Sequence, residues 1–419
     1  MLKGLEKLSV SQKFVVLALA AEKILKDQPV VFYYFGPRSL KKRAADLEGE
    51  KIASVIDELR NLEEETCLLD DSSPLFRRSY LRSQIKSLWA FLRYSGLKLT
   101  GETLTSAVNE VIGVSVVKPY DLNEAKNKLR KLLSGIGYSS YEQFKKERAK
   151  GSGVVKDSEI RKDIKLLKDC CENDIVPNIL FGDRLVKKLR SSKVDISKPK
   201  KGYPSCYYIY RGHGLADMRL SGQHRYDKIS VVQSLMHELY PGHHFFYLYR
   251  ELLFEMGFLG EEATIDLLYS AETPLNEGIA EAAYAYLESL DAELLKYIKV
   301  AMFREQFCKK VLYNVWYRMY VDGDFDRANG CDYLMSEGFI ENEKIKGLME
   351  MIDNWRVYYP AYTIGREIVS NYLDDTGKKG LYHLYLPKPL SILAEKNNER
   401  RGYEEKSCAS ILCSDRLVE

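Results

Sequence analysis

The sequence predicts a mainly α-helical protein with a small β element near its middle. Three observations predict this fold class. Up to about residue 190, apolar and charged residues alternate at three- and four-residue spacing, as on amphipathic helices. Residues 205–220 are short, aromatic or alternating segments around the turn Gly212-His213-Gly214, which indicates a hairpin or a pair of strands. Helical spacing returns at Ile229 and continues to about residue 380.

These residue patterns divide the chain into four regions. Residues 1–190 form a helical N-terminal region, and residues 191–204 form a basic, proline-containing connector. Residues 205–385 follow as the region in which the chemically distinctive residues gather. Residues 386–419 are polar, so we expect them to form a peripheral C-terminal tail.

The composition excludes several classes of partner. The chain has 419 residues with 63 Lys and Arg against 60 Asp and Glu, so its formal net charge is only +3. Such a balance gives no basic field for nucleic acid. An apolar run at residues 14–21 is far shorter than the ~20 residues of a membrane span, and no secretory cleavage site follows it. We therefore expect a cytoplasmic protein with no nucleic-acid or membrane partner, of open oligomeric state.

Histidine is distributed very unevenly along the chain. There are six histidines, and five of them lie between positions 213 and 244. His237 and Glu238 are adjacent within an apolar helical pattern that begins at Ile229, and burying such a pair is unfavourable unless both side chains find partners. In His-Glu-x-x-His metallopeptidases, two histidines one turn apart bind zinc and the glutamate polarises the metal-bound water.

Pro241 stands where the second histidine of that motif would be. On an unbroken helix, neither His243 nor His244 could share one ion with His237. Proline must distort the helix, because its ring clashes with the carbonyl four residues earlier and it has no N–H group, and Gly242 tolerates the distortion. If the distortion absorbs two residues, His243 becomes the second ligand. We prefer His243 as the ligand and assign His244 a supporting position.

A third ligand is expected from a separate helix. Pro274 suits the first helical position, so a helix should start there. Glu277 and Glu281 are four residues apart and share one face of this helix. We assign Glu277 as the third ligand and Glu281 as the carboxylate that accepts a hydrogen bond from His237. Small residues such as Gly278 would let this helix approach the histidine-bearing helix closely.

These motifs together resemble a known family. HELYPGHH at 237–244, the glutamate of NEGIAE at 276–281 and YPAYTIG at 359–365 are similar to the domain-of-unknown-function 885 family, whose members carry His-Glu-x-x-Pro-Gly-His and are regarded as gluzincin-like zinc peptidases. The likeness extends from about residue 205 to 375. The chain departs from the family at Ile279, where an aromatic residue is common, and in having no histidine near Trp316.

The resemblance implies a multi-helical, gluzincin-like metallopeptidase with one Zn²⁺ ion and a peptide or oligopeptide substrate. If His237, His243 and Glu277 bind zinc, the fourth position is open to water, as in catalytic sites. Glu238 would then act as the general base. The tetrahedral oxyanion needs a further donor, and by resemblance Tyr362 is the favoured one.

Other residues are assigned to the substrate side. Arg366, one helical turn after Tyr362, could hold a substrate carboxylate. Residues 206–220 could offer an edge strand to the extended substrate backbone, as gluzincins typically do just upstream of the metal helix. His213 and His224 lie in turn-like contexts and are either on the substrate side or structural.

Two other classes of function compete with this interpretation. Two histidines and one carboxylate also form the ligand set of non-haem iron oxygenases, although those sites usually lie in β-barrels. A non-catalytic helical binding module with a structural or vestigial metal site is the second alternative. The sequence leaves open the length of the substrate and whether the enzyme attacks chain ends or internal bonds.

Overall fold

The computed structural model is mainly α-helical, as the sequence predicts. It describes residues 2, 4–69, 77–150, 153, 156–198, 206–220, 226–338 and 340–386. The helices in these ranges are α1 (Val10–Ile24), α2 (Arg38–Ala45), α3 (Ile52–Glu65), α4 (Arg77–Tyr94), α5 (Gly101–Ile112), α6 (Leu122–Gly135), α7 (Tyr141–Lys150), α8 (Asp157–Cys170), α9 (Gly182–Ser191), α10 (Lys228–Glu238), α11 (His243–Glu255), α12 (Thr273–Ala282), α13 (Ala292–Tyr317), α14 (Arg327–Gly338), α15 (Asn342–Asn354), α16 (Arg366–Thr376) and α17 (Leu381–Tyr385). The strands are β1 (Val31–Tyr34), β2 (Lys193–Ser197), β3 (Cys206–Gly212), β4 (Leu215–Leu220) and β5 (Ile265–Leu267).

The strands form two small sheets. β3 and β4 are the antiparallel hairpin that the sequence predicts, and β2 pairs with β4 in parallel, so the strand order is β2-β4-β3. β2 lies inside the segment 191–204, which the sequence marks as a connector. β1 and β5 pair antiparallel in a separate sheet. Sequence analysis missed β1, β2 and β5, because strands of four, five and three residues are too short to show an alternating pattern.

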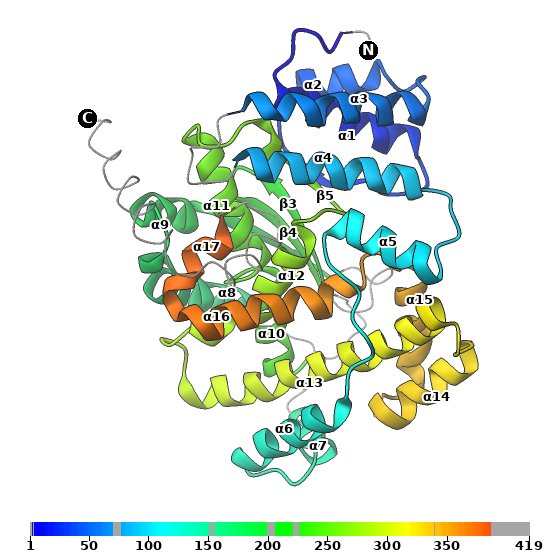
Figure 1. Cartoon of the computed structure of the whole chain (residues 1–419). Coiled ribbons are helices and arrows are strands. Elements are labelled where there is room, and N and C mark those ends of the chain that lie inside the picture. The colour runs from blue at the N-terminus through cyan, green and yellow to red at the C-terminus, as the bar shows by residue number, and fades with distance from the viewer. Residues whose placement is uncertain are drawn as a thin grey trace.

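The described residues form two large hydrophobic cores and a small cluster of Leu129, Leu133, Phe144 and Val300. One core packs helices α1–α4 together with Ile265 and Leu267 of β5. The larger core takes residues from Tyr33 to Leu386 and includes α5, α8 and α9 as well as the helices after β4. Figure 1 shows the α1–α4 layer at one end of the molecule and α6 and α7 at the other. The larger core therefore contains residues from both sides of segment 191–204.

The helical pattern is interrupted around Pro241, which lies between two separate helices. α10 ends at Glu238, the peptide bond before Pro241 is cis, and α11 begins at His243. The Tyr385 hydroxyl of α17 donates a hydrogen bond of 2.8 Å to the Pro241 carbonyl. The expected kink or bulge is thus a complete interruption between α10 and α11.

Gly242 is required at this break by the space around it and suits its backbone angles. Its φ of −75° with ψ of −138° lies outside the main α and β regions, in agreement with the conformational freedom that sequence analysis invoked. A Cβ atom at this position would lie 1.8 Å from the carbonyl oxygen of His237. The Gly242 N–H group also donates a 3.0 Å hydrogen bond to the Met236 carbonyl. Gly242 therefore lets the start of α11 lie directly against the end of α10.

Some expectations concern parts of the chain beyond this description. Within the described ranges, no helix combines the length and the apolar character that crossing a bilayer requires. His224 lies outside the described residues, and so does the predicted tail 386–419 except for Leu386.

Candidate metal centre

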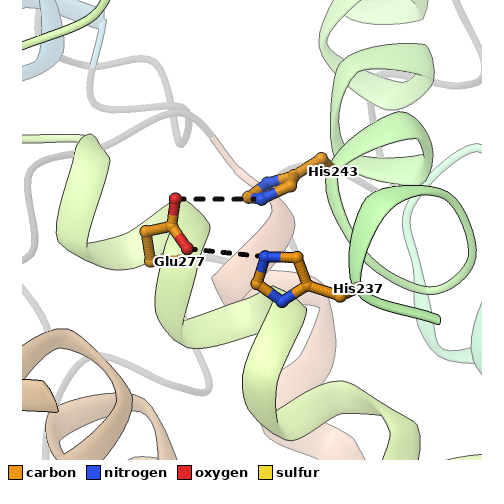
Figure 2. Close-up of side chains that lie close together, drawn as sticks. All are labelled: His237, His243 and Glu277. Carbon is orange, nitrogen blue, oxygen red and sulfur yellow. Dashed lines mark ion pairs between the residues drawn. The ribbon is translucent and has the colours of Figure 1, made fainter. Parts of the chain in front are cut away.

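His237, His243 and Glu277 come together at the break between α10 and α11. The Glu277 carboxylate of α12 faces both imidazole rings, with Oε2 3.7 Å from Nε2 of His237 and Oε1 3.8 Å from Nε2 of His243 (Figure 2). One ligand atom from each residue lies within 4.8 Å of the other two. The three residues that the sequence assigns as ligands are therefore neighbours in space.

The position of Glu277 depends on two glycines where α12 packs against the following turn, Gly278 of α12 and Gly365 of that turn. A Cβ atom on Gly278 would lie 2.6 Å from the Gly365 carbonyl oxygen, and one on Gly365 would lie 2.2 Å from the Pro274 carbonyl oxygen. A side chain at either position would push α12 away from the π turn Ala361–Gly365. Sequence analysis expected Gly278 to face the histidine-bearing helix. This prediction is wrong, because Gly278 lies close to the turn that carries Tyr362.

The ligand set suits a zinc ion. Two imidazole nitrogens and one carboxylate oxygen form the protein ligands of many catalytic zinc sites. Oε2 of Glu277 is buried and has no hydrogen-bond partner in the described structure, which is unfavourable unless a cation or donor meets it. Ligands at zinc-binding distance in tetrahedral geometry lie about 3.4 Å apart. The separations of 3.7 and 3.8 Å involve different oxygens of Glu277 and the three ligand atoms lie within 4.8 Å of one another, so binding a zinc ion would draw the side chains closer together.

Glu281 takes the supporting position that the sequence assigns to it. Its Oε1 lies 3.0 Å from Nδ1 of His237 and 2.5 Å from Nζ of Lys309 on α13. Burial alone lowers the pKa of His237, but the hydrogen bond and charge of Glu281 outweigh it and raise the pKa to about 9. Burial raises the pKa of Glu281, but the charge of Lys309 and the hydrogen bond with His237 hold it well below its usual range. This pairing occupies Nδ1 and leaves Nε2 of His237 for a metal.

Asn276 supports His243 in the same way, and sequence analysis missed it. Its Oδ1 lies 2.9 Å from Nδ1 of His243, and its side-chain amide donates a 2.7 Å hydrogen bond to the Tyr247 hydroxyl. The Tyr247 hydroxyl donates in turn to Oδ2 of Asp266 at 2.9 Å. The available signal was an asparagine next to Glu277 on a helix whose ten residues are all buried. A buried amide requires partners, and a ligand histidine is one.

His244 faces the core and not the other ligands. Its Nδ1 lies 2.9 Å from the Tyr208 hydroxyl, and its ring packs edge-on against Tyr240. Burial lowers the pKa of His244 to about 3, so its ring is neutral. Its support for the centre is indirect, through Tyr208, whose ring lies over His243 at 6.5 Å between centroids. Of the two histidines, His243 is the one within the cluster.

A cavity of about 190 Å³ opens beside the ligands, and Glu238, Tyr358 and Tyr362 line it. The Tyr358 hydroxyl donates a 2.6 Å hydrogen bond to Oε1 of Glu277. Burial and the charge of Glu277 raise the pKa of Tyr362, so its hydroxyl stays protonated and able to donate. Sequence analysis selected Tyr362 and missed Tyr358, although both belong to the same aromatic run.

Arg366 is not among the described residues that line the cavity. It begins α16, and its positive charge helps to lower the pKa of Glu281, while at Tyr284 it opposes the rise in pKa that burial causes. Its Nη1 atom is buried without a hydrogen-bond partner in the described structure. This position on the Glu281 side gives no support to the predicted role in holding a substrate carboxylate.

The β3 strand borders the cavity as an edge strand of its sheet. Residues 206–208 line the cavity, and β4 pairs with the opposite side of β3. The substrate role predicted for residues 206–220 therefore narrows to β3, since β4 is the central strand. His213 lies at the hairpin tip with an exposed ring. Its backbone N–H group donates a hydrogen bond to the Glu251 carboxylate. This contact is structural.

Comparisons with known proteins show the fold and leave the activity open. No family model matches the chain, and no curated protein does. Among solved structures, a "putative lipoprotein" from Colwellia psychrerythraea is similar, with a TM-score of 0.52 and 14% sequence identity over 86% of this chain and 62% of that chain. A protein of the same description and unknown function from Shewanella oneidensis gives a TM-score of 0.39 and 13% identity over 91% of this chain and 82% of that chain.

These two structural similarities differ in whether they support a shared fold. The Colwellia structure shows that the two chains share a fold, and this chain spans about 62% of that protein's length. The Shewanella superposition is too loose to support an argument.

Proposed function

We propose that the protein hydrolyses peptide bonds with one zinc ion held by His237, His243 and Glu277. The observation that carries the proposal is that this ligand set and Glu238 border one cavity, along which an edge strand runs. Bound zinc supplies a Lewis acid that lowers the pKa of a water molecule toward ~7 and polarises a carbonyl group. Peptide hydrolysis uses both effects.

The residues of the chain divide the remaining work. Glu238 follows His237 at the end of α10, takes a proton from the attacking water and passes it to the leaving amine. The Tyr362 hydroxyl donates a hydrogen bond to the oxyanion that develops on the substrate. The edge of β3 that lines the cavity pairs with the substrate main chain, which gives affinity without selecting side chains.

Two variants measured for zinc content and for cleavage of a mixed peptide library test the proposal. Glu238→Gln should keep its zinc and lose about 10²- to 10⁴-fold in kcat/KM, because it removes the base and not a ligand. Glu277→Ala should lose zinc. Glu255→Gln removes a surface carboxylate whose side chain is 47% exposed, and it should change neither quantity. Full activity in zinc-loaded Glu238→Gln would falsify the assignment of Glu238.

The same measurements separate the other functions. Iron in the purified protein, with oxygen-dependent turnover, would point to a non-haem iron enzyme. Stoichiometric zinc without cleavage of any library peptide would point to a non-catalytic binding module. Mass spectrometry of the products distinguishes attack at chain ends from attack at internal bonds. The cytoplasmic location stays a prediction.

A further inference from the structure

The cavity beside the metal centre has a second acidic part. Asp266 of β5 and Glu272, directly before α12, line it in addition to Glu238 and Glu277. No lysine or arginine is among the described residues of its wall. The proposed function assigns Glu277 as a metal ligand and Glu238 as the base that activates water. Asp266 and Glu272 remain without an assigned role.

These two carboxylates share a single buried guanidinium. Nη1 of Arg250 lies 2.9 Å from Oε2 of Glu272 and 3.6 Å from Oδ1 of Asp266. Above the pKa of Asp266, which burial raises to about 7, two ionised carboxylates against one cation leave a negative charge at this end of the cavity. Glu272 is only 2% exposed, and its Oε1 has no hydrogen-bond partner within the described structure. A buried carboxylate oxygen in that state indicates a cation or donor that binds from the cavity.

The separation between the metal ligands and Asp266 indicates which kind of substrate cation could reach the acidic end. Two side chains, Asn276 and Tyr247, stand between His243 and Asp266, joined by hydrogen bonds of 2.9, 2.7 and 2.9 Å. A free substrate α-amine sits on the carbon next to the scissile carbonyl, so it would stay near the metal. A lysine or arginine side chain extends several bonds further and reaches the acidic end.

The apolar part of the cavity wall suits such a side chain. Phe32, Tyr247 and Leu267 line it. Apolar and aromatic groups pack well against the methylene stem of lysine or arginine, and an aromatic face attracts the charged end. The cavity therefore combines an apolar passage with an acidic end.

We propose that this cavity binds a lysine or arginine side chain of the peptide next to the scissile bond, with Asp266 and Glu272 as its acceptors. The inference rests on the proposed function and adds a substrate class to it. It predicts a preference for basic residues, whereas pairing along β3 acts on the main chain and gives none.

A matched peptide series tests the preference on the zinc-loaded, full-length protein. The peptides have the form acetyl-Ala-Ala-Xaa-Ala-Ala-amide, with Xaa as lysine, arginine, norleucine or glutamate, and each is also made with a free N-terminus. Lysine and arginine peptides should give kcat/KM values about 10- to 100-fold above norleucine, because a charged hydrogen bond is worth that ratio. Equal values for lysine and norleucine would overturn the inference and leave peptide hydrolysis standing. Cleavage that depends on the free N-terminus and not on Xaa would also overturn it, since the bound cation would then be the α-amine.

Variants locate the acceptors. Asp266→Asn and, separately, Glu272→Gln keep the side-chain shape and should each lower the ratio of lysine to norleucine cleavage about 10-fold. Asp195→Asn removes an exposed carboxylate on β2 and should leave the ratio unchanged. Wild-type ratios in both site variants would contradict the assignment.

Binding of a cationic probe separates this inference from the failure of catalysis. Zinc-loaded Glu238→Gln protein is titrated calorimetrically with N-acetyl-lysinamide and with N-acetyl-norleucinamide. The lysine compound should bind about 10-fold more tightly, and adding Asp266→Asn should remove the difference. If no peptide is cleaved but this preference is present, the proposed hydrolysis fails and the cation site stands. Equal binding of both compounds rejects the cation site.

Discussion

Two buried ionic clusters of this molecule solve the same electrostatic problem differently. Around Arg250, the chain supplies its own cation, and the guanidinium contacts Glu272, the Tyr80 hydroxyl and two backbone carbonyls. Around His237, His243 and Glu277, the nearby cation is Lys309, and it pairs with Glu281 and not with Glu277. Glu272 and Glu277 each keep a carboxylate oxygen without a hydrogen-bond partner in the described structure, but only Glu272 also pairs with an arginine.

The pairing with Arg250 gives the first cluster a structural role that the metal cluster lacks. A charged group that is buried with its partner ties together the elements that carry both, here α4, α11 and the start of α12. A buried carboxylate without a built-in cation leaves a place for a cation from outside. The two clusters are joined through Asn276 and Tyr247, so each can be perturbed while the other serves as the reference.

Breaking the structural cluster should have the largest effect. Arg250→Met keeps much of the side-chain volume but leaves Glu272 and Asp266 uncompensated. We expect the free energy of unfolding to fall by about 3–5 kcal/mol, as for a broken buried ion pair. Denaturant titration measures it. Arg211→Met breaks the exposed pair with Asp195 and should change the same quantity by no more than about 1 kcal/mol; equal losses would mean that the Arg250 cluster is not structural.

Asp266 should make that stability depend on pH. Burial, with the charge of Glu272 adding to it against that of Arg250, raises the pKa of Asp266 to about 7. The folded state therefore holds this proton more tightly than the unfolded chain, where the pKa is near ~3.9, and ionisation destabilises the fold as pH rises between these values.

Asp266→Asn is neutral throughout and lacks this penalty. Its free energy of unfolding minus that of the wild type should increase by about 1–4 kcal/mol from pH 4 to pH 7 and then level off. Unfolding titrations at matched pH values measure the difference. A difference independent of pH would show that Asp266 is ionised at all of them.

Disturbing the link between the clusters should weaken metal binding without unfolding the protein. Asn276→Ala removes the partner of Nδ1 of His243 and should lower zinc affinity about 10- to 100-fold, the usual effect of losing a group that orients a ligand. Competition with a chromophoric chelator measures it. Asn329→Ala, at an exposed position of α14, is the matched control and should bind zinc like the wild type.

Local patterns predicted what depends on neighbours in sequence. Helical spacing gave the mainly α-helical class, and Pro241 marked the place where His243 is brought toward His237. Contacts between distant segments left no such pattern. Lys309 reaches Glu281 from another helix, and Asp266 belongs to a three-residue strand whose partner lies near the N-terminus. These residues were missed because their environment is set by tertiary packing.

The pairing of β1 with β5 also orders events during synthesis of the chain. Residues 31–34 leave the ribosome long before residues 265–267, with which they pair. The core of helices α1–α4 includes Ile265 and Leu267, so the emerging N-terminal segment has apolar surface that its own residues cannot cover. Until β5 is made, that surface must be shielded by transient contacts or by chaperones. The core of helices α1–α4 is therefore completed only after α10 and α11, which carry two of the candidate metal ligands, have been made.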